Sequence, residues 1–213
     1  MNSMTDSNPY LLNQKKTFST HNVLLSQIGK NQTVLDVGCN EGYLGQISDK
    51  SCTFYGLDIS ENAVAKAKAV YKDAAVCNLD DCKKLPWDQK FDMIMLGDVL
   101  EHTKDPAKVL KNLVENYLKD SGSVVLSLPN VANWRIRLSL FFGNFDYTDT
   151  GILDRTHLRF FTFKTAQALV SRSNLSITKV RYGSSIFGHL IKLLPLSFVR
   201  NLFASSIIIV AKK

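Results

Sequence analysis

The sequence predicts an α/β fold of the doubly wound, Rossmann-like kind, and three observations carry this prediction. An apolar, β-branched run at residues 33–37 leads into a glycine-punctuated turn and then a helical pattern. A second apolar run ends at Asp58, about twenty residues after Gly38, where such folds place an acidic residue that binds ribose. Apolar runs then alternate with helical patterns, which is typical of a mostly parallel sheet.

The turn at residues 38–45 reads G-x-N-x-G-x-x-G, which differs from the dinucleotide fingerprint G-x-G-x-x-G. Asp36 and Glu41 lie beside it, and two carboxylates would repel a pyrophosphate. They suit a ligand with a cationic portion and hydroxyls, such as S-adenosylmethionine (SAM), which has an ammonium and a sulfonium. The alternative is an ordinary turn, with Asp58 capping the helix that begins near Glu61.

At these residues the chain resembles the class I SAM-dependent methyltransferases, whose first motif has the form D-x-G-C-x-x-G. Asn40 replaces the commoner glycine at the centre of that motif, and Asn tolerates a left-handed backbone. The resemblance covers nearly the whole chain and implies seven strands, the last antiparallel, a lid after the fifth strand, SAM as cofactor and S-adenosylhomocysteine (SAH) as product. The cofactor-binding residues it implies are Tyr10, Asp36, Gly38, Asn40, Gly42, Asp58, Ile59, Asn78, Leu79, Gly97 and Asp98.

The chain reads as one domain of 213 residues with 45% apolar content and no visible linker. We divide it into an N-terminal segment and helix (1–30), a SAM-binding core (31–130), an acceptor lid (131–163) and C-terminal helices and strands (164–213). Within it, Ser60 and Asp105 are expected helix caps, a turn is expected at 120–122 before a fifth strand at 123–128, and His21 is expected at the surface.

Charge is unevenly placed along the chain. The net charge is +7, and residues 130–213 hold 12 of the 26 Lys and Arg but 3 of the 19 Asp and Glu. A basic second half favours anionic partners, although a solvated surface explains the same pattern.

The four cysteines, Cys39, Cys52, Cys77 and Cys82, form no C-x-x-C pair and follow no signal peptide. We therefore expect a reduced, cytoplasmic compartment and no metal site. No apolar run reaches the ~18 residues of a membrane span.

Residues 97–102 follow a buried fourth strand and so reach the carboxyl edge of the sheet, where open α/β folds bind ligands. Methyl transfer to a hydroxyl or an amine releases a proton from the acceptor. A histidine side chain can accept such a proton, so His102 is the expected general base, and Asp98 or Glu101 could orient it. The alternative is that Glu101 and His102 only fix the cofactor loop.

Residues 131–163 mix aromatic and basic side chains, and as an insertion after the fifth strand they could roof the site. With D-V-L-E-H at 98–102, S-x-P-N at 127–130 and L-D-R-T-H-x-R-F-F-T at 153–162, the chain looks like a bacterial methyltransferase subgroup that accompanies glycosyltransferases in surface-glycan pathways. Arginines suit carboxylate or phosphate recognition, although Arg155, His157 and Arg159 could equally brace the lid. The expected acceptor residues are Asn130, Trp134, Tyr147, Arg155, His157 (also a catalytic candidate) and Arg159.

The segment 186–203 is strongly apolar, with Lys192, Arg200 and a break at Pro195. It could pack on the lid, form a homodimer or lie on the inner face of a membrane as a peripheral contact. Packing is the favoured alternative, and a monomer or a homodimer both fit the sequence.

These patterns predict SAM-dependent methylation of a small-molecule hydroxyl on a glycan-related metabolite. A lipid-linked or quinone-type acceptor is the enzymatic alternative. A non-catalytic SAM-binding partner of a glycosyltransferase is the alternative from another class. A nucleic-acid substrate is disfavoured because the chain shows no appended RNA-binding module.

Overall fold

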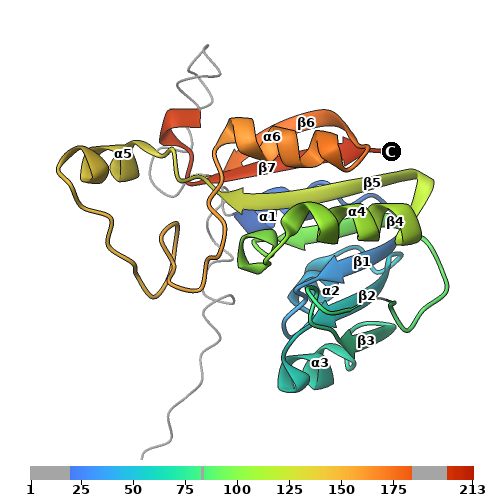
Figure 1. Cartoon of the computed structure of the whole chain (residues 1–213). Coiled ribbons are helices and arrows are strands. Elements are labelled where there is room, and N and C mark those ends of the chain that lie inside the picture. Colours follow the sequence, from blue (N-terminus) through green and yellow to red (C-terminus); the bar gives the residue numbers. More distant parts are fainter. Residues whose placement is uncertain (1–19, 83, 184–200) are drawn as a thin grey trace, which may run out of the picture.

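The computed structural model describes residues 20–82, 84–183 and 201–213 (Figure 1). The predictions for Tyr10 and for residues 186–200 therefore lie outside the described residues. The described chain forms one seven-stranded sheet in the order β3-β2-β1-β4-β5-β7-β6. Its strands are β1 (Thr33–Val37), β2 (Thr53–Asp58), β3 (Asp73–Val76), β4 (Phe91–Gly97), β5 (Leu118–Pro129), β6 (Ser176–Gly183) and β7 (Ser206–Lys212).

Strands β1 to β5 pair in parallel, whereas β7 runs antiparallel to both of its neighbours, β5 and β6. The prediction of a doubly wound, mostly parallel sheet with an antiparallel last strand is confirmed. The order reverses at β1 and β4, whose carboxyl ends therefore border a crevice that can hold a ligand.

Helices cover both faces of this sheet, and Figure 1 shows α4 and α6 in front of it and α1 behind. Short polar side chains set where several helices begin. Ser60 accepts a hydrogen bond from the Ala63 amide, and Asp105 accepts one from the Lys108 amide ahead of a proline. The helices are α1 (Thr20–Leu25), α2 (Tyr43–Ile47), α3 (Glu61–Ala67), the 3₁₀ turn η2 (Leu100–His102), α4 (Pro106–Tyr117), α5 (Trp134–Phe141) and α6 (Phe163–Arg172).

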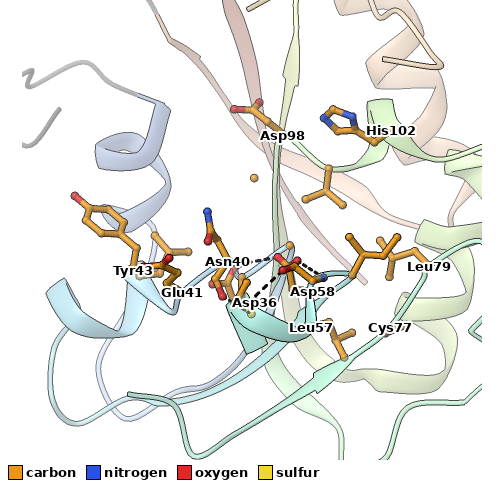
Figure 2. Close-up of a pocket in the computed structure, with 18 of the residues that line it drawn as sticks. Asp36, Asn40, Glu41, Tyr43, Leu57, Asp58, Cys77, Leu79, Asp98 and His102 are labelled. Carbon is orange, nitrogen blue, oxygen red and sulfur yellow. Dashed lines mark hydrogen bonds between the residues drawn. The ribbon is translucent and has the colours of Figure 1, made fainter. Parts of the chain in front are cut away.

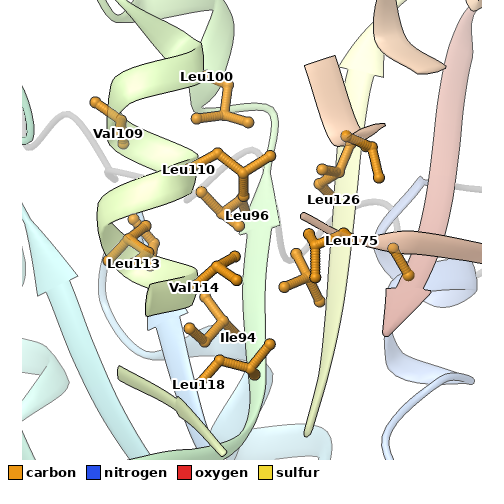
Figure 3. Close-up of a cluster of buried hydrophobic side chains, with 14 of the residues drawn as sticks. Ile94, Leu96, Leu100, Val109, Leu110, Leu113, Val114, Leu118, Leu126 and Leu175 are labelled. Atoms are coloured by element: carbon orange, nitrogen blue, oxygen red, sulfur yellow. The ribbon is translucent and has the colours of Figure 1, made fainter. Parts of the chain in front are cut away.

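Two apolar clusters fill the space between the sheet and its helices. Figure 3 shows the larger cluster, where Leu110 and Val114 of α4 pack on Leu96 of β4. Strand β7 supplies both clusters alternately, with Ile209 on the α4 face and Ile208 on the α1 face. This alternation follows from the two-residue period of a strand and explains why the run 206–212 is continuously apolar at its centre.

The predicted turn at 120–122 is wrong, because β5 already begins at Leu118. Leu118 pairs with Phe91 and Ser123 pairs with Met93, so β5 carries extra residues that bulge out of the ladder. Gly122 permits the bulge, since a Cβ there would stand 2.6 Å from the Leu118 side chain. A glycine next to polar residues predicts a break in a strand, and the same composition also serves a bulge.

The predicted lid, residues 131–163, follows β5 and projects from the carboxyl end of that strand (Figure 1). Asn133 caps α5, and no residue of α5 is buried. The lid contacts the core again at Leu158 and Arg159, whose backbone amides both donate to the Glu101 carbonyl. Within the described residues, every helix is too short or too polar to span a lipid bilayer.

Candidate functional site

A cavity of about 460 Å³ lies at the carboxyl ends of β1, β2 and β4, which is the place that the topology predicts. Figure 2 shows Asn40 and Asp58 at one end of it, and Asp98 and His102 at the other. Nine of the predicted cofactor residues line this cavity: Asp36, Gly38, Asn40, Asp58, Ile59, Asn78, Leu79, Gly97 and Asp98. Gly42 does not, because it turns the chain into α2 against Ala67 and Tyr71.

The glycine turn brings bare backbone to the cavity. Gly38 has φ of +74°, and a Cβ there would stand 2.4 Å from Cγ2 of Val99. Asn40 has φ of +48°, which confirms that asparagine takes the left-handed conformation at the centre of this motif. The turn therefore requires residues that tolerate a left-handed backbone, glycine at 38 and asparagine at 40. Without a side chain at residue 38, it leaves room for a ligand beside the first strand.

Asp58 joins two loops at this end of the cavity. Its Oδ2 accepts a hydrogen bond from the Asn40 amide at 2.8 Å, and its Oδ1 accepts one from the Ser60 amide at 2.9 Å. Ser60, not Asp58, caps α3, so the capping alternative is wrong. Each carboxylate oxygen has a second lone pair, and the side chain can therefore still accept bonds from ligand hydroxyls.

Asp36 lies at the end of β1, buried, and its Oδ2 accepts a hydrogen bond from the Tyr71 hydroxyl at 2.5 Å. Burial raises the pKa of Asp36 to about 7, and the charge of Asp58 adds to this while the Tyr71 bond opposes it. Glu41, the second carboxylate of the motif, pairs instead with Lys66 at 2.8 Å. Asp36 is therefore a buried acid at the cavity whose charge changes near neutral pH.

Several lining residues were not predicted from the sequence, among them His21, Leu24, Tyr43 and Thr103. His21 was expected at the surface, and this is wrong, because α1 lies against the sheet and turns the ring into the cavity. Burial lowers the pKa of His21, opposed by the charge of Asp98. The phase of α1 was the available signal, since Leu24 is buried and His21 lies three residues before it on the same face.

At the other end, Asp98 has φ of +53° and its Oδ1 accepts a hydrogen bond from the Ser127 hydroxyl at 2.8 Å. Burial raises the pKa of Asp98, and the Ser127 bond opposes this. His102 is exposed to the cavity, and its Nδ1 lies 3.3 Å from the Thr156 carbonyl oxygen of the lid. The fourth strand and the lid thus meet at His102.

Behind His102 lie two buried titratable groups. The Glu101 residue is 0% exposed, and neither of its carboxylate oxygens has a hydrogen-bond partner among the described residues. Its Oε1 lies 4.0 Å from Nε2 of His157, whose ring centroid lies 4.8 Å from that of His102. Burial raises the pKa of Glu101 well above its usual range and lowers that of His157. His157 contributes to this cluster without lining the cavity itself.

The structure places the remaining predicted acceptor residues outside the cavity lining. Asn130 is buried, and its amide donates to the carbonyls of Asn201 and Ala204, so it ties the end of β5 to the segment before β7. The Trp134 ring lies 6.3 Å from that of Phe203, measured between centroids. These two side chains join segments that are far apart in the sequence.

Three further predicted acceptor residues make contacts near the lid. Tyr147 packs its ring against Phe145 and Phe160, and Arg155 forms an exposed ion pair with Asp149 at 2.7 Å. Arg159 donates to the Lys104 carbonyl. These contacts agree with the bracing alternative, while Arg155 remains open to solvent on its other donors.

Comparison with known proteins places this site in a family. A family model described as a methyltransferase domain matches residues 12–180. The ubiquinone biosynthesis O-methyltransferase of Pseudomonas paraeruginosa is 30% identical over 107 residues, which are 46% of this chain and 45% of that protein. Its counterpart in Coxiella burnetii is 32% identical over 107 residues, 47% of this chain and 45% of the relative. The match thus spans about half the length of each curated relative, and neither is named for a glycan pathway.

Solved structures share the fold at low sequence identity. A SAM-dependent methyltransferase from Archaeoglobus fulgidus has a TM-score of 0.64 at 20% identity, over 96% of this chain and 99% of that one. The magnesium protoporphyrin IX methyltransferase of Synechocystis, solved with bound SAH, has a TM-score of 0.58 at 18% identity, over 86% and 75%. With the family match over most of its length and the cavity at the expected sheet edge, the chain belongs to the class I SAM-dependent methyltransferases.

Proposed function

We propose that the protein transfers the methyl group of SAM to a hydroxyl of a small molecule, and that the acceptor is of the phenolic, quinone-precursor type. The observation that carries the proposal is that one continuous cavity runs from Asp58 to His102. One end has the groups that suit an adenosine portion, and the other has a solvent-accessible base. The names of the curated relatives support oxygen as the methylated atom and a quinone precursor as its carrier.

The cofactor end suits SAM in shape and in charge. A volume of about 460 Å³ lies within the range of small-molecule sites. The Asp58 carboxylate would accept from ribose hydroxyls, and the bare turn at Gly38 allows close approach. Asp36 would stabilise positive charge when it is ionised. SAM supplies an electrophilic methyl carbon, and the chain must supply the site that positions the acceptor and receives its proton.

The acceptor end centres on His102. Its Nδ1 lies 3.3 Å from the Thr156 carbonyl oxygen, which can only accept, and 3.2 Å from the Thr156 hydroxyl oxygen. That hydroxyl donates its own hydrogen to Asp154, so Nδ1 of His102 carries the hydrogen and Nε2 keeps the lone pair. Glu101, His157 and His102 lie together, and of these three only His102 lines the cavity. We therefore assign to His102 the contact with the acceptor hydroxyl. Asp98, held by Ser127, lies nearby and would orient the acceptor.

A hydroxyl of a glycan-linked metabolite is the second candidate. The observation that favours it is the lid motif at 153–162 together with the basic composition of residues 130–213. Arg155 is the exposed cation that could meet an anionic acceptor, since its partner Asp149 is itself exposed. A quinone precursor would instead use the exposed aromatic side chains of the lid, among them Tyr147 and Phe142.

The proposal is tested by methyl transfer from isotopically labelled SAM to three acceptor groups: catechols and hydroxylated quinone precursors, nucleotide-linked sugars, and RNA. We expect methylation of the first group. Turnover of nucleotide-linked sugars alone would replace the main proposal with the second candidate. SAH binding without turnover of any acceptor group would overturn both candidate acceptors and leave the cofactor site standing.

A further inference from the structure

The Glu101 carboxyl group is buried, and none of the contacts described so far gives it a hydrogen-bond partner. A buried carboxylate without hydrogen bonds destabilises the folded state strongly, so such a group either holds a proton or is paired with a water molecule or an ion. Both oxygens of Glu101 are buried and lack a hydrogen-bond partner among residues 20–82, 84–183 and 201–213. The 4.0 Å separation from Nε2 of His157 is too long for a hydrogen bond.

The tautomer of His157 decides whether its Nε2 can donate a hydrogen to Glu101. Nδ1 of His157 lies 3.1 Å from the Ile152 carbonyl oxygen, which can only accept, so Nδ1 carries the hydrogen in the neutral ring. Nε2 then keeps a lone pair and lies 4.0 Å from Oε1 of Glu101. Two lone-pair groups facing each other in a buried site repel each other unless a proton or a cation lies between them.

His102 completes the arrangement. Glu101, His102 and His157 each offer one ligand atom, and the three atoms lie within 4.8 Å of one another. Nδ1 of His102 faces the Thr156 carbonyl just as Nδ1 of His157 faces the Ile152 carbonyl. Metal-bound imidazoles commonly donate their second N–H to a carbonyl, which fixes the ring orientation and the tautomer.

We propose that Glu101, His102 and His157 bind one divalent transition-metal ion. Two imidazoles and a carboxylate suit Zn²⁺ or Mn²⁺ better than Mg²⁺ or Ca²⁺, which favour ligand sets made only of oxygens. Metal bonds of about 2.0–2.2 Å place neighbouring ligand atoms roughly 3 Å apart, so the side chains would draw together on binding. Such rotation is available to His102, which is exposed to the cavity.

The position of the site gives the ion a role in acceptor binding, and this role rests on the function proposed above. Three protein ligands leave coordination positions open, and His102 places them at the cavity. An acceptor hydroxyl bound there would have its pKa lowered by the ion and would lose its proton to solvent. With the ion bound, Nε2 of His102 would be a metal ligand, and the ion rather than Nε2 would activate the acceptor hydroxyl.

The test is metal binding by the full chain after dialysis against a chelator. Titration with MnCl₂ and with ZnCl₂ is expected to show one equivalent bound, with a rise in melting temperature. Glu101→Gln, His157→Ala and His157→Gln are expected to weaken binding by at least tenfold. His21→Ala, which changes a cavity histidine outside the cluster, serves as the matched control and is expected to bind as the wild type does.

Spectroscopy with Co²⁺ separates this site from the four cysteines. Ligation by nitrogen and oxygen gives visible d–d bands without the near-ultraviolet charge transfer of a thiolate. Absence of stoichiometric binding, strong thiolate charge transfer, or unchanged binding in all three variants would overturn the metal site. SAH binding in the same preparations distinguishes this from the proposed function: a chain that binds SAH but no metal keeps the function, and a chain that binds metal but not SAH keeps the site.

Discussion

The Tyr71 hydroxyl donates a hydrogen bond of 2.5 Å to Asp36, and it does so in a position where the carboxyl is buried but still borders the cavity. The ring of Tyr71 also stacks on Phe54 and fills the space opposite Gly45 and Gly56. The first acidic residue of the SAM motif is thus held from behind by an aromatic side chain 35 residues later in the chain.

The first prediction concerns this carboxyl and the stability of the ligand-free protein. The pKa of Asp36 is about 7, above its usual 3.8, so the folded state holds a proton that the unfolded state releases. Its contribution to the free energy of unfolding is fully present below pH 4 and is lost as pH rises through 7. Over that range the contribution falls by an amount on the order of 4 kcal/mol.

Urea unfolding of the wild type and of Asp36→Asn at pH 4.5, 6 and 8 measures this change. The variant is expected to lack the part of the pH slope that Asp36 supplies. Asp88→Asn, an exposed carboxylate on the surface, is the control and should follow the wild type. Equal slopes in the wild type and Asp36→Asn would mean that Asp36 is ionised throughout.

The second prediction concerns the cofactor contact of Asp58. Loss of a charged acceptor for ribose hydroxyls is expected to weaken binding by about 1.5–3 kcal/mol, or about 10- to 150-fold. Calorimetric titration of Asp58→Ala with SAH measures it, and Asp88→Ala is the control. Since Asp58 also holds the Asn40 and Ser60 amides, the melting temperature is measured in parallel. Unchanged SAH affinity would remove Asp58 from the binding site.

The third prediction compares two glycines with similar backbones and different surroundings. Gly38 and Gly143 have φ of +74° and +79°, but a Cβ meets Val99 at 2.4 Å in the first case and nothing within 4 Å in the second. Gly143→Ala is expected to lose about 1–2 kcal/mol of stability from backbone strain alone.

Gly38→Ala adds to the same backbone strain a steric overlap between the new Cβ and Val99. We expect a further loss of about 1–3 kcal/mol and weaker SAH binding, because the turn or Val99 must move at the cavity. Thermal or urea unfolding of both variants gives the comparison. Equal destabilisation would show that Val99 rotates away without effect.

The fourth prediction concerns the acceptor end. His102→Ala is expected to lower kcat by about 10²–10⁴-fold while SAH affinity stays within twofold, because acceptor activation belongs to the transition state. His21→Gln is the comparison, since it lines the same cavity but lies outside the cluster at Glu101. It is expected to alter SAH affinity more than kcat. Near-normal kcat in His102→Ala from pH 6 to 9 would assign the activation of the acceptor to another group.

The cofactor side of the site was predictable because local rules determine it. Gly38 and Asn40 need left-handed backbone, and Asp58 ends the neighbouring strand, so residues close in the sequence define the geometry. Continuous apolar runs likewise place the buried strands. The start of β5 was predicted incorrectly because its bulge depends on pairing with β4, which composition does not reveal.

The acceptor side depends on contacts between distant segments. Asn130 was expected to meet a ligand, yet its amide bonds carbonyls more than 70 residues away. The contact between Glu101 and His157 joins η2 to the lid across 56 residues, and the sequence contained both motifs without showing that they meet. His21 lines the cavity because α1 packs against the sheet, and the sequence of α1 alone does not predict this packing.

Strand β7 lies between β5 and β6 although it follows both along the chain. During synthesis, β6 therefore leaves the ribosome with no neighbour to pair with, and β5 has one unpaired edge until residues 206–212 emerge. An exposed edge of this kind invites pairing with other chains. The sheet can close only after β7 inserts, so we expect premature termination before residue 206 to yield an aggregating product rather than a smaller folded domain.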